Sequence, residues 1–310
     1  MNEIQRLRHP LVSTFSIVAF DPSTKDLGVA VQSRYFSVGS VVPWAEADVG
    51  AVATQSFVNV SYGPRGLQLL KEGFTVDEVI ARLTKDDEEK EYRQLGIIDS
   101  RGEAHAFTGQ KCLEWAGSKV GENYAAQGNI LAGKQVVQDM GREFESTKGD
   151  LAERLVAALK GGETAGGDAR GRQSAALLVV RRNLGRGGYG DKYIDLRIED
   201  HPNPIVELKR LLNLHRVYSL IDDGEDKLTK GDLKTALAAL KKAVSLNPNI
   251  DDAQVDLGIV NLKLGKKNEA ANAFDRALRL NPKMKTLIKQ LPNVGLIKPD
   301  QELFAELGIL

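Results

Sequence analysis

A 34-residue offset between two similar segments is the feature that most constrains how this 310-residue chain can fold. The segment LTKGDLKTALAALKKAVSLNP ends at Pro248, and LKLGKKNEAANAFDRALRLNP ends at Pro282. At this offset Gly231 coincides with Gly265, Ala236 with Ala270, Leu240 with Phe274, Ala243 with Ala277, and Asn247 with Asn281. Small residues at fixed positions let paired helices approach closely, and Asn-Pro ends the second helix of each pair. The offset therefore predicts stacked helical hairpins.

The spacing and the residue types resemble tetratricopeptide repeats, at about residues 217–250 and 251–284. Because roughly three such repeats are normally needed to bury a continuous core, two should borrow flanking helices. We expect those helices in PIVELKRLLNLHRVYSL, KTLIKQL and PDQELFAELGIL. The repeats either stabilise the fold or a homodimer, or form a groove for a protein or peptide partner. Both interpretations stay open.

The first two thirds of the chain alternate between short apolar strands and amphipathic helices. Strands are predicted for residues 15–20, 27–34, 49–57, 124–131, 173–182 and 192–200, with a further hairpin over 91–109. Helices are predicted for residues 63–73, 75–87, 132–147 and 150–163, with Thr75 as an N-cap. Two helix pairs separated by groups of strands indicate two sheets packed face to face with helices outside. This is a four-layer αββα sandwich of the α+β class.

The composition excludes several classes of protein. Lys plus Arg and Asp plus Glu both number 42, so the basic surface of a nucleic-acid-binding protein is not expected. One cysteine, Cys112, cannot form an internal disulfide, and the four histidines lack ligand spacing, so no metal and no cofactor are predicted. No apolar run approaches the roughly 18 residues that span a bilayer, and residues 1–13 lack a signal-peptide core. We expect a cytoplasmic protein without a membrane partner.

Several long motifs between residues 13 and 215 resemble one bacterial family. They include STFSIVAFDPSTKDLGVAVQSRYFSVGS, YRQLGIIDS, YAAQGNIL, GGDARGRQSAALLVV and DLRIEDHPNPIVELKRLL. This family has no known function and is classed as similar to the N-terminal-nucleophile (Ntn) hydrolases. The resemblance implies a leader over residues 1–13, an Ntn-hydrolase-like domain over 14–215, and hydrolysis of an amide bond in an unknown small substrate. Residues 216–310 then form the tetratricopeptide-like domain.

The resemblance implies Thr14 as the nucleophile, because it opens the first strand. An Ntn nucleophile uses its own free α-amino group, which titrates near pH 8, as the base. Backbone or side-chain amides then stabilise the oxyanion. Ser33-Arg34 is similar to a Ser-Arg pair of proteasome-type subunits. Ser16 is a weaker candidate, because strand alternation places it on the same face as Thr14.

Further polar residues gather at the ends of predicted strands. Gln55 and Asn59 precede a helix that carries Arg65, and Asn129 follows Gln127 and Gly128 at another junction. Amides and helix N-termini are good receptors for an oxyanion or a carboxylate, so Gln55, Asn59 and Asn129 are candidate catalytic residues. Candidate substrate-binding residues are Arg34, Arg65, Asp168, Arg170 and Gln173. Each cluster has a second interpretation, in which caps and ion pairs order a loop.

Two functions stay open at this point. The first is an Ntn-type amide hydrolase. The second is a non-catalytic protein that keeps the Ntn fold while its repeats recruit a partner. The amine of Thr14 lies in a peptide bond unless Ser13–Thr14 is cleaved, and the third-strand region VVPWAEADVGAVATQ contains no lysine to tune the threonine. Both observations favour the second, whereas the position of Thr14 and the clustered amides favour the first.

Three other features have simpler expected roles. Cys112 stands beside Leu and Trp and is expected to be a small buried hydrophobic residue. His201, in EDHPNP, is expected to cap a helix or lie at the surface. The run TKDDEEKEYR, residues 84–93, predicts a solvated helix end.

Overall fold

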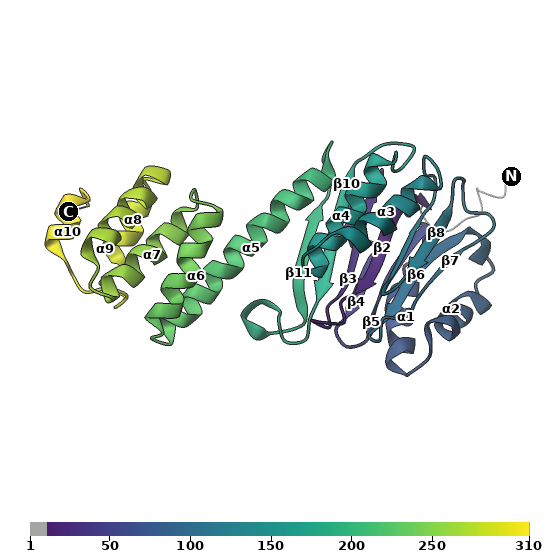
Figure 1. The fold of residues 1–310 in the computed structure, drawn as a ribbon, viewed down its shortest axis with the longest axis horizontal. Helices are drawn as coiled ribbons and strands as arrows, with labels where there is room; N and C mark the ends of the chain where they lie inside the picture. Colours follow the sequence, from purple (N-terminus) through teal and green to yellow (C-terminus); the bar gives the residue numbers. More distant parts are fainter. Residues whose placement is uncertain (1–10, 310) are drawn as a thin grey trace. The chain divides into compact units, whose positions relative to one another are not determined.

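The computed structural model describes residues 11–309 and divides the chain into two compact units. The boundary falls between Leu212 and Asn213, inside helix α5 (Pro204–Thr229). The first unit is a mixed α+β structure with two antiparallel sheets, and the second is all-helical (Figure 1). No described helix has both the length and the apolar character that a membrane span requires.

The first sheet contains five strands in the order β1-β5-β6-β7, with β4 paired to the same edge of β5 as β1. These strands are β1 (Leu11–Val12), β4 (Pro43–Glu46), β5 (Gly50–Phe57), β6 (Arg93–Asp99) and β7 (Ala104–Thr108). The predicted hairpin over residues 91–109 is confirmed as β6 and β7. Val12 pairs with Ser56, and Leu11 pairs with Phe57.

The second sheet contains six strands in the order β11-β10-β3-β2-β9-β8. They are β2 (Thr14–Phe20), β3 (Leu27–Ser33), β8 (Gly117–Gly121), β9 (Tyr124–Gly128), β10 (Ser174–Val180) and β11 (Lys192–Ile198). The predicted hairpin around DPSTKD is confirmed, since Thr14 pairs with Ser33 and Phe20 with Leu27. The chain therefore passes from the first sheet to the second at Ser13.

Helices cover one face of each sheet. The helices α1 (Tyr62–Lys71) and α2 (Val76–Lys85) share an apolar cluster with Val52, Leu95 and Ile97 of the first sheet. Figure 1 shows α3 (Gln135–Ser146) and α4 (Leu151–Thr164) over the second sheet, and their side chains cluster with Phe15, Ile17 and Leu177. Thr75 forms a capping box with Glu78, which confirms the predicted N-cap of α2.

A third apolar cluster fills one end of the space between the two sheets. It contains Val18, Phe20, Leu27 and Val29 from the second sheet and Ala51, Ala53 and Ile98 from the first. Side chains alternate between the two faces of a strand, so Thr14 and Ser16 continue the row of Val18 and Phe20 on this inner face. The row thus changes from apolar to polar towards the start of β2. This change positions the candidate site.

The second unit contains the later part of α5 and five further helices. These are α6 (Leu233–Leu246), α7 (Asp251–Lys263), α8 (Lys267–Leu280), α9 (Met284–Gln290) and α10 (Gln301–Glu306). The three helices expected around the repeats are confirmed as α5, α9 and α10. A Cβ added to Gly258 would lie 2.6 Å from Phe274, and one added to Gly224 would lie 2.7 Å from Leu240. The small residues therefore permit the close helix contacts that the repeat pattern predicts.

Among residues 11–309 there are also the short 3₁₀ segments η2 (Val38–Ser40), η3 (Lys90–Tyr92) and η4 (Arg186–Gly188).

Candidate functional site

Polar side chains from both sheets meet between the sheets near the start of β2. We call this set the amide cluster; it comprises Ser16, Gln55, Gln94, Thr108, Gln127 and Asn129. The Ser16 hydroxyl donates to Gln55 Oε1 at 2.6 Å and accepts from Gln127 Nε2 at 2.7 Å. These bonds join β2 and β9 of one sheet to β5 of the other. The amide cluster therefore links the two sheets at one end of the layer between them, and apolar residues fill the other end.

Gln94 is the centre of the amide cluster. Its Oε1 accepts from Gln55 Nε2 at 2.8 Å and from Asn129 Nδ2 at 2.9 Å. Its Nε2 donates to Thr108 Oγ1 at 2.9 Å and to the Gly128 carbonyl at 2.8 Å. Gln94 is fully buried, so each of these bonds compensates for lost hydration. Gln94 is not among the residues predicted from the sequence, although the alternation of β6 could have placed it on the inner face.

Two amide oxygens of the cluster have no partner. Gln127 Oε1 and Asn129 Oδ1 are buried and accept no hydrogen bond from the described residues. Buried acceptors of this kind usually bind ordered water or a ligand. The described residues therefore leave two hydrogen-bond acceptors of the amide cluster without a donor.

Thr14 adjoins the amide cluster through its backbone. Its carbonyl accepts from the Asn129 backbone N–H at 3.0 Å and from Gln55 Nε2 at 3.5 Å. Its hydroxyl donates to the carbonyl of Gln32, and its exposed fraction is 0%. The structure thus brings three candidate catalytic residues together: Thr14, Gln55 and Asn129.

The carbonyl of Ser13 receives two side-chain donors. One is the Ser33 hydroxyl, and the other is Arg170 Nη2 at 2.9 Å. Ser33 lies opposite Thr14 in the β2–β3 register, which holds its hydroxyl beside the Ser13–Thr14 peptide bond. We call Ser13, Ser33 and Arg170 the carbonyl site. A guanidinium and a hydroxyl on one carbonyl oxygen are suited to stabilising an oxyanion.

Asp168 orients Arg170 at the carbonyl site. Asp168 Oδ1 accepts from Arg170 Nε at 3.0 Å, and Oδ2 accepts from Nη2 at 2.7 Å. The side chain of Asp168 has an exposed fraction of 0% and that of Arg170 33%, so a buried carboxylate holds a partly exposed guanidinium through two bonds. Asp168 Oδ2 also accepts from the Arg34 backbone N–H, and Arg34 Nη1 donates to Gln173 Oε1 at 2.7 Å. Four of the five predicted substrate-binding residues therefore lie around the Ser13–Thr14 bond.

The backbone is strained at two positions beside these groups. Ser56, in β5, has φ 69°, and Ile130, which follows Asn129, has φ 50°. A β-branched residue rarely adopts positive φ, and such strain is concentrated at functional sites. Ser56 pairs with Val12, and the Ile130 carbonyl accepts from the Ala169 backbone N–H at 2.9 Å, so each residue contacts a neighbour of the carbonyl site.

Two predicted site residues belong elsewhere. Asn59 Nδ2 donates to Asp87 Oδ2 at 3.2 Å, and its Oδ1 accepts from Ser61. Arg65 is exposed on α1. Neither residue shares a hydrogen bond with the amide cluster or the carbonyl site among the described contacts.

The prediction of a solvated helix end over residues 84–93 is wrong for Asp87 and Arg93. Arg93 is 1% exposed and forms ion pairs with Asp87 at 3.0 Å and with Glu89 at 2.5 Å. Burial alone would raise the pKa of Asp87, but hydrogen bonds from Arg93, Tyr62 and Asn59 outweigh it and hold the pKa well below its usual range. Burial and the bond to Asp87 raise the pKa of Tyr62. The charges of this run thus organise the end of β5.

Cys112 and His201 have the expected simple roles. Cys112 is buried, its thiol donates to the Arg93 carbonyl at 3.3 Å, and burial raises its pKa. His201 Nδ1 accepts from the Asn203 backbone N–H immediately before α5 begins. Within residues 11–309, no group of three or more His, Cys, Asp or Glu side chains has a geometry suited to a metal ion.

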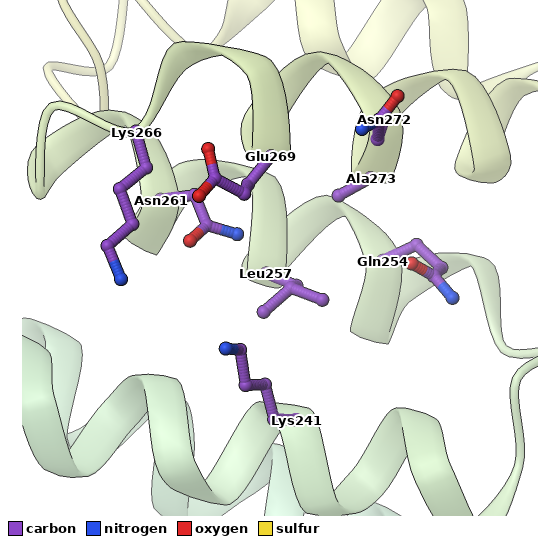
Figure 2. A pocket seen from close by; sticks show the side chains of 8 residues that line it. All are labelled: Lys241, Gln254, Leu257, Asn261, Lys266, Glu269, Asn272 and Ala273. Carbon is purple, nitrogen blue, oxygen red and sulfur yellow. The ribbon is translucent and has the colours of Figure 1, made fainter.

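The second unit contains a shallow pocket of about 310 Å³ between α6, α7 and α8. Figure 2 shows the amino group of Lys241 facing Leu257 and Asn261 across this pocket. Asn261 is 3% exposed, and its Oδ1 has no partner among the described residues.

Comparisons with known proteins agree with this division of the chain. Residues 227–291 match the tetratricopeptide-repeat model, and repeats of this kind suggest interaction with a protein. The crystal structure of protein SPO2555 from Silicibacter pomeroyi, described as a DUF1028 protein, is similar to this chain with a TM-score of 0.59 and 33% identity. The match covers 64% of this chain and 84% of that one. No curated protein matches the sequence. Residues 14–208, more than half of the chain, match the model of the family of unknown function DUF1028, and the chain belongs to that family.

Proposed function

We propose that the first unit is an amide hydrolase of the Ntn type, which is activated by cleavage of its own Ser13–Thr14 bond. The layering supports this proposal, since two antiparallel sheets share an inner cluster and each has helices on its other face. This layering supports the αββα arrangement that the Ntn resemblance implies. Thr14 opens β2 at the polar end of the inner layer.

The carbonyl site is the observation that carries the proposal. Cleavage of a peptide bond by the following threonine requires that the preceding carbonyl be polarised while the hydroxyl attacks. Ser33 and Arg170 both donate to the Ser13 carbonyl, and Asp168 fixes the guanidinium. A carbonyl that only terminates a strand would not need a charged donor held by a buried carboxylate.

The chemistry balances with water as the only co-reactant. Thr14 Oγ1 attacks the carbonyl carbon of Ser13, the C–N bond breaks, and the proton of the hydroxyl passes to the departing nitrogen. Water then hydrolyses the resulting ester, which leaves a Ser13 carboxylate and a free Thr14 amine. That amine serves as the base for later attack on a substrate amide, since it titrates near pH 8. Arg170 and Ser33 stabilise the oxyanion in both reactions.

Burial explains why cleavage must come first. Ser13 and Thr14 both have an exposed fraction of 0%, so an external substrate cannot reach the hydroxyl while Leu11–Ser13 is in place. Attack of Thr14 on the Ser13 carbonyl creates the amine, and hydrolysis of the ester then releases the leader and frees the hydroxyl for an external substrate.

The intact mass of the purified protein tests the proposal. We expect a chain that begins at Thr14. Thr14→Val keeps the shape of the side chain without the hydroxyl and should retain residues 1–13, whereas Thr14→Ser should be cleaved. A wild-type chain that keeps its leader and yet hydrolyses amides would contradict the mechanism.

A second candidate function is non-catalytic binding. The complete burial of Thr14 in the uncleaved chain favours it, together with the pocket lined by Lys241 and Asn261 in the second unit. In that case the carbonyl site would only secure the crossing between the sheets. The same mass measurement distinguishes the two, because a binding protein would keep its Ser13–Thr14 bond.

A further inference from the structure

The segment Leu11–Ser13 lies in the first unit as an extended peptide would lie in a binding cleft. Leu11 and Val12 pair with Phe57 and Ser56 at the edge of β5, and the next carbonyl, that of Ser13, lies in the carbonyl site. Pairing of β1 with β5 therefore places the Ser13 carbonyl against the donors of Arg170 and Ser33. The chain presents its own leader to Thr14 as a first substrate.

The edge that the leader covers would remain after cleavage. β4 pairs with β5 only over Gly50–Ala53, so loss of β1 leaves Ser56 and Phe57 unpaired on that edge. The Phe57 carbonyl accepts from the buried Arg93 at 2.5 Å, which fixes this end of β5. A fixed, unpaired strand edge is a template for an added strand.

We propose that the substrate is an extended peptide that pairs with Ser56–Phe57 in place of β1 and is cleaved after the residue that replaces Ser13. This inference rests on the proposed hydrolase activity and assigns its substrate class. The acyl part of the peptide follows the path of Leu11–Ser13, and the bond broken is the amide that follows it. The Thr14 oxygen takes up the acyl group, the departing amine takes the proton, and water releases the acid.

The burial of each leader residue predicts the side chains that the substrate should carry. Ser13 is 0% exposed, so the residue before the cleaved bond should be small. Its Oγ is buried without a partner, so alanine should serve as well as serine. Val12 is 0% exposed and belongs to the apolar cluster between the sheets, so the preceding position should be branched and apolar. Leu11 is only partly buried, so the third position should be tolerant.

The test compares fluorogenic aminomethylcoumarin amides on full-length protein whose processing has been measured by intact mass. Acetyl-Leu-Val-Ser is the matched peptide, and acetyl-Leu-Val-Phe has a large residue at the buried position. Acetyl-Ser lacks the strand, and a peptide with N-methylated Leu and Val keeps the side chains but removes two strand N–H groups. We expect kcat/KM for the matched peptide to exceed that of each control by about tenfold or more.

Each outcome bears on the inference. Selective cleavage of the matched peptide, lost in Thr14→Val, supports it. A processed protein that cleaves acetyl-Ser or the N-methylated peptide equally well overturns the peptide assignment and leaves the hydrolase proposal standing. An unprocessed protein that cleaves none of the four overturns both.

Discussion

Arg170 Nη2 donates to the carbonyl of Ser13 at 2.9 Å, although 157 residues separate the two in the sequence. The contact forms because β2 and β10 flank β3 in one sheet, which brings the start of β2 close to the loop before β10. Asp168, in that loop, then sets the orientation of the guanidinium. This one contact links the sheet order to the chemistry proposed for Thr14.

Arg170→Met should slow cleavage of the Ser13–Thr14 bond. Loss of one donor from an oxyanion site typically costs on the order of 10²-fold in rate. Arg170→Lys should retain part of the rate, because it keeps the charge but not the bidentate bond to Asp168. Arg172→Met is the matched control, since Arg172 pairs with Glu163 instead. The rate is measured by mass spectrometry after synthesis in a cell-free system.

Equal cleavage rates in wild type and Arg170→Met would remove the carbonyl site from the mechanism. Slowing by Arg172→Met as large as that by Arg170→Met would assign the effect to general destabilisation of the loop.

Gln94→Met should destabilise the first unit although Met has nearly the size and shape of Gln. The substitution leaves the amides of Gln55 and Asn129 without their shared acceptor in a buried layer. Each buried polar group left unpaired costs about 1–3 kcal/mol, so we expect a loss of about 3 kcal/mol in the free energy of unfolding. Urea denaturation followed by tryptophan fluorescence measures it, because both tryptophans, Trp44 and Trp115, lie in this unit.

The control for this variant is Gln68→Met, at an exposed position of α1. It should change the free energy of unfolding by less than about 0.5 kcal/mol. If Gln94→Met is as stable as this control, the amide cluster contributes little to the fold.

The elements were predictable where local pattern decides them. The β2–β3 hairpin follows from alternating apolar residues around DPSTKD, and the α2 start follows from Thr75 with Glu78 three residues later. The repeat offset predicted close helix contacts at small residues, and the close approach of Phe274 to Gly258 is one of them. Each of these features depends on residues near in sequence or on a fixed period.

The site was predictable only in part, because its assembly depends on strand order. Thr14, Gln55, Asn129 and Arg170 were selected as polar residues at strand ends, but no local pattern shows which ends meet. Gln94, the second residue of β6, was not selected, although strand alternation could have placed it on the inner face. Asn59 was grouped with Gln55 because the two are close in sequence, but Asn59 lies after the end of β5 and its side chain donates to Asp87.

Asp87→Asn should destabilise the protein near neutral pH and lose this effect in acid. Asp87 is ionised in the folded state, with a pKa well below its usual range, so its stabilisation is present above the unfolded pKa of 3.8 and is lost as pH falls below it. The substitution leaves Arg93 with only Glu89 as an ionic partner and should cost about 3 kcal/mol at neutral pH. The difference between the urea midpoints of the two proteins should stay constant from about pH 7 to pH 5 and should narrow from about pH 4 downward, because the loss continues until pH reaches the depressed folded pKa. A difference that does not narrow between about pH 4 and pH 2 would contradict the ion-pair explanation.

The free energy of unfolding of the helical unit should fall as pH rises towards 7, because of Asp256 in α7. Burial, together with the charges of Glu225 and Asp252 and a hydrogen bond to Glu225, raises the pKa of Asp256 to about 7. In the unfolded chain the pKa of Asp256 is near its ordinary value of 3.8, so between these two pH values the folded state binds more protons. Stability therefore decreases across this interval and levels off above it.

Asp256→Asn keeps a hydrogen-bonding group and removes the charge, so it should stabilise the unit by about 2 kcal/mol at about pH 8 and by much less at about pH 4. Asp222→Asn, at an exposed position of α5, is the matched control. The free energy of unfolding of all three proteins is measured by urea denaturation followed by far-ultraviolet circular dichroism. If the wild-type stability rises between about pH 5 and pH 7, and Asp256→Asn follows the same curve, then Asp256 is already ionised in the folded unit.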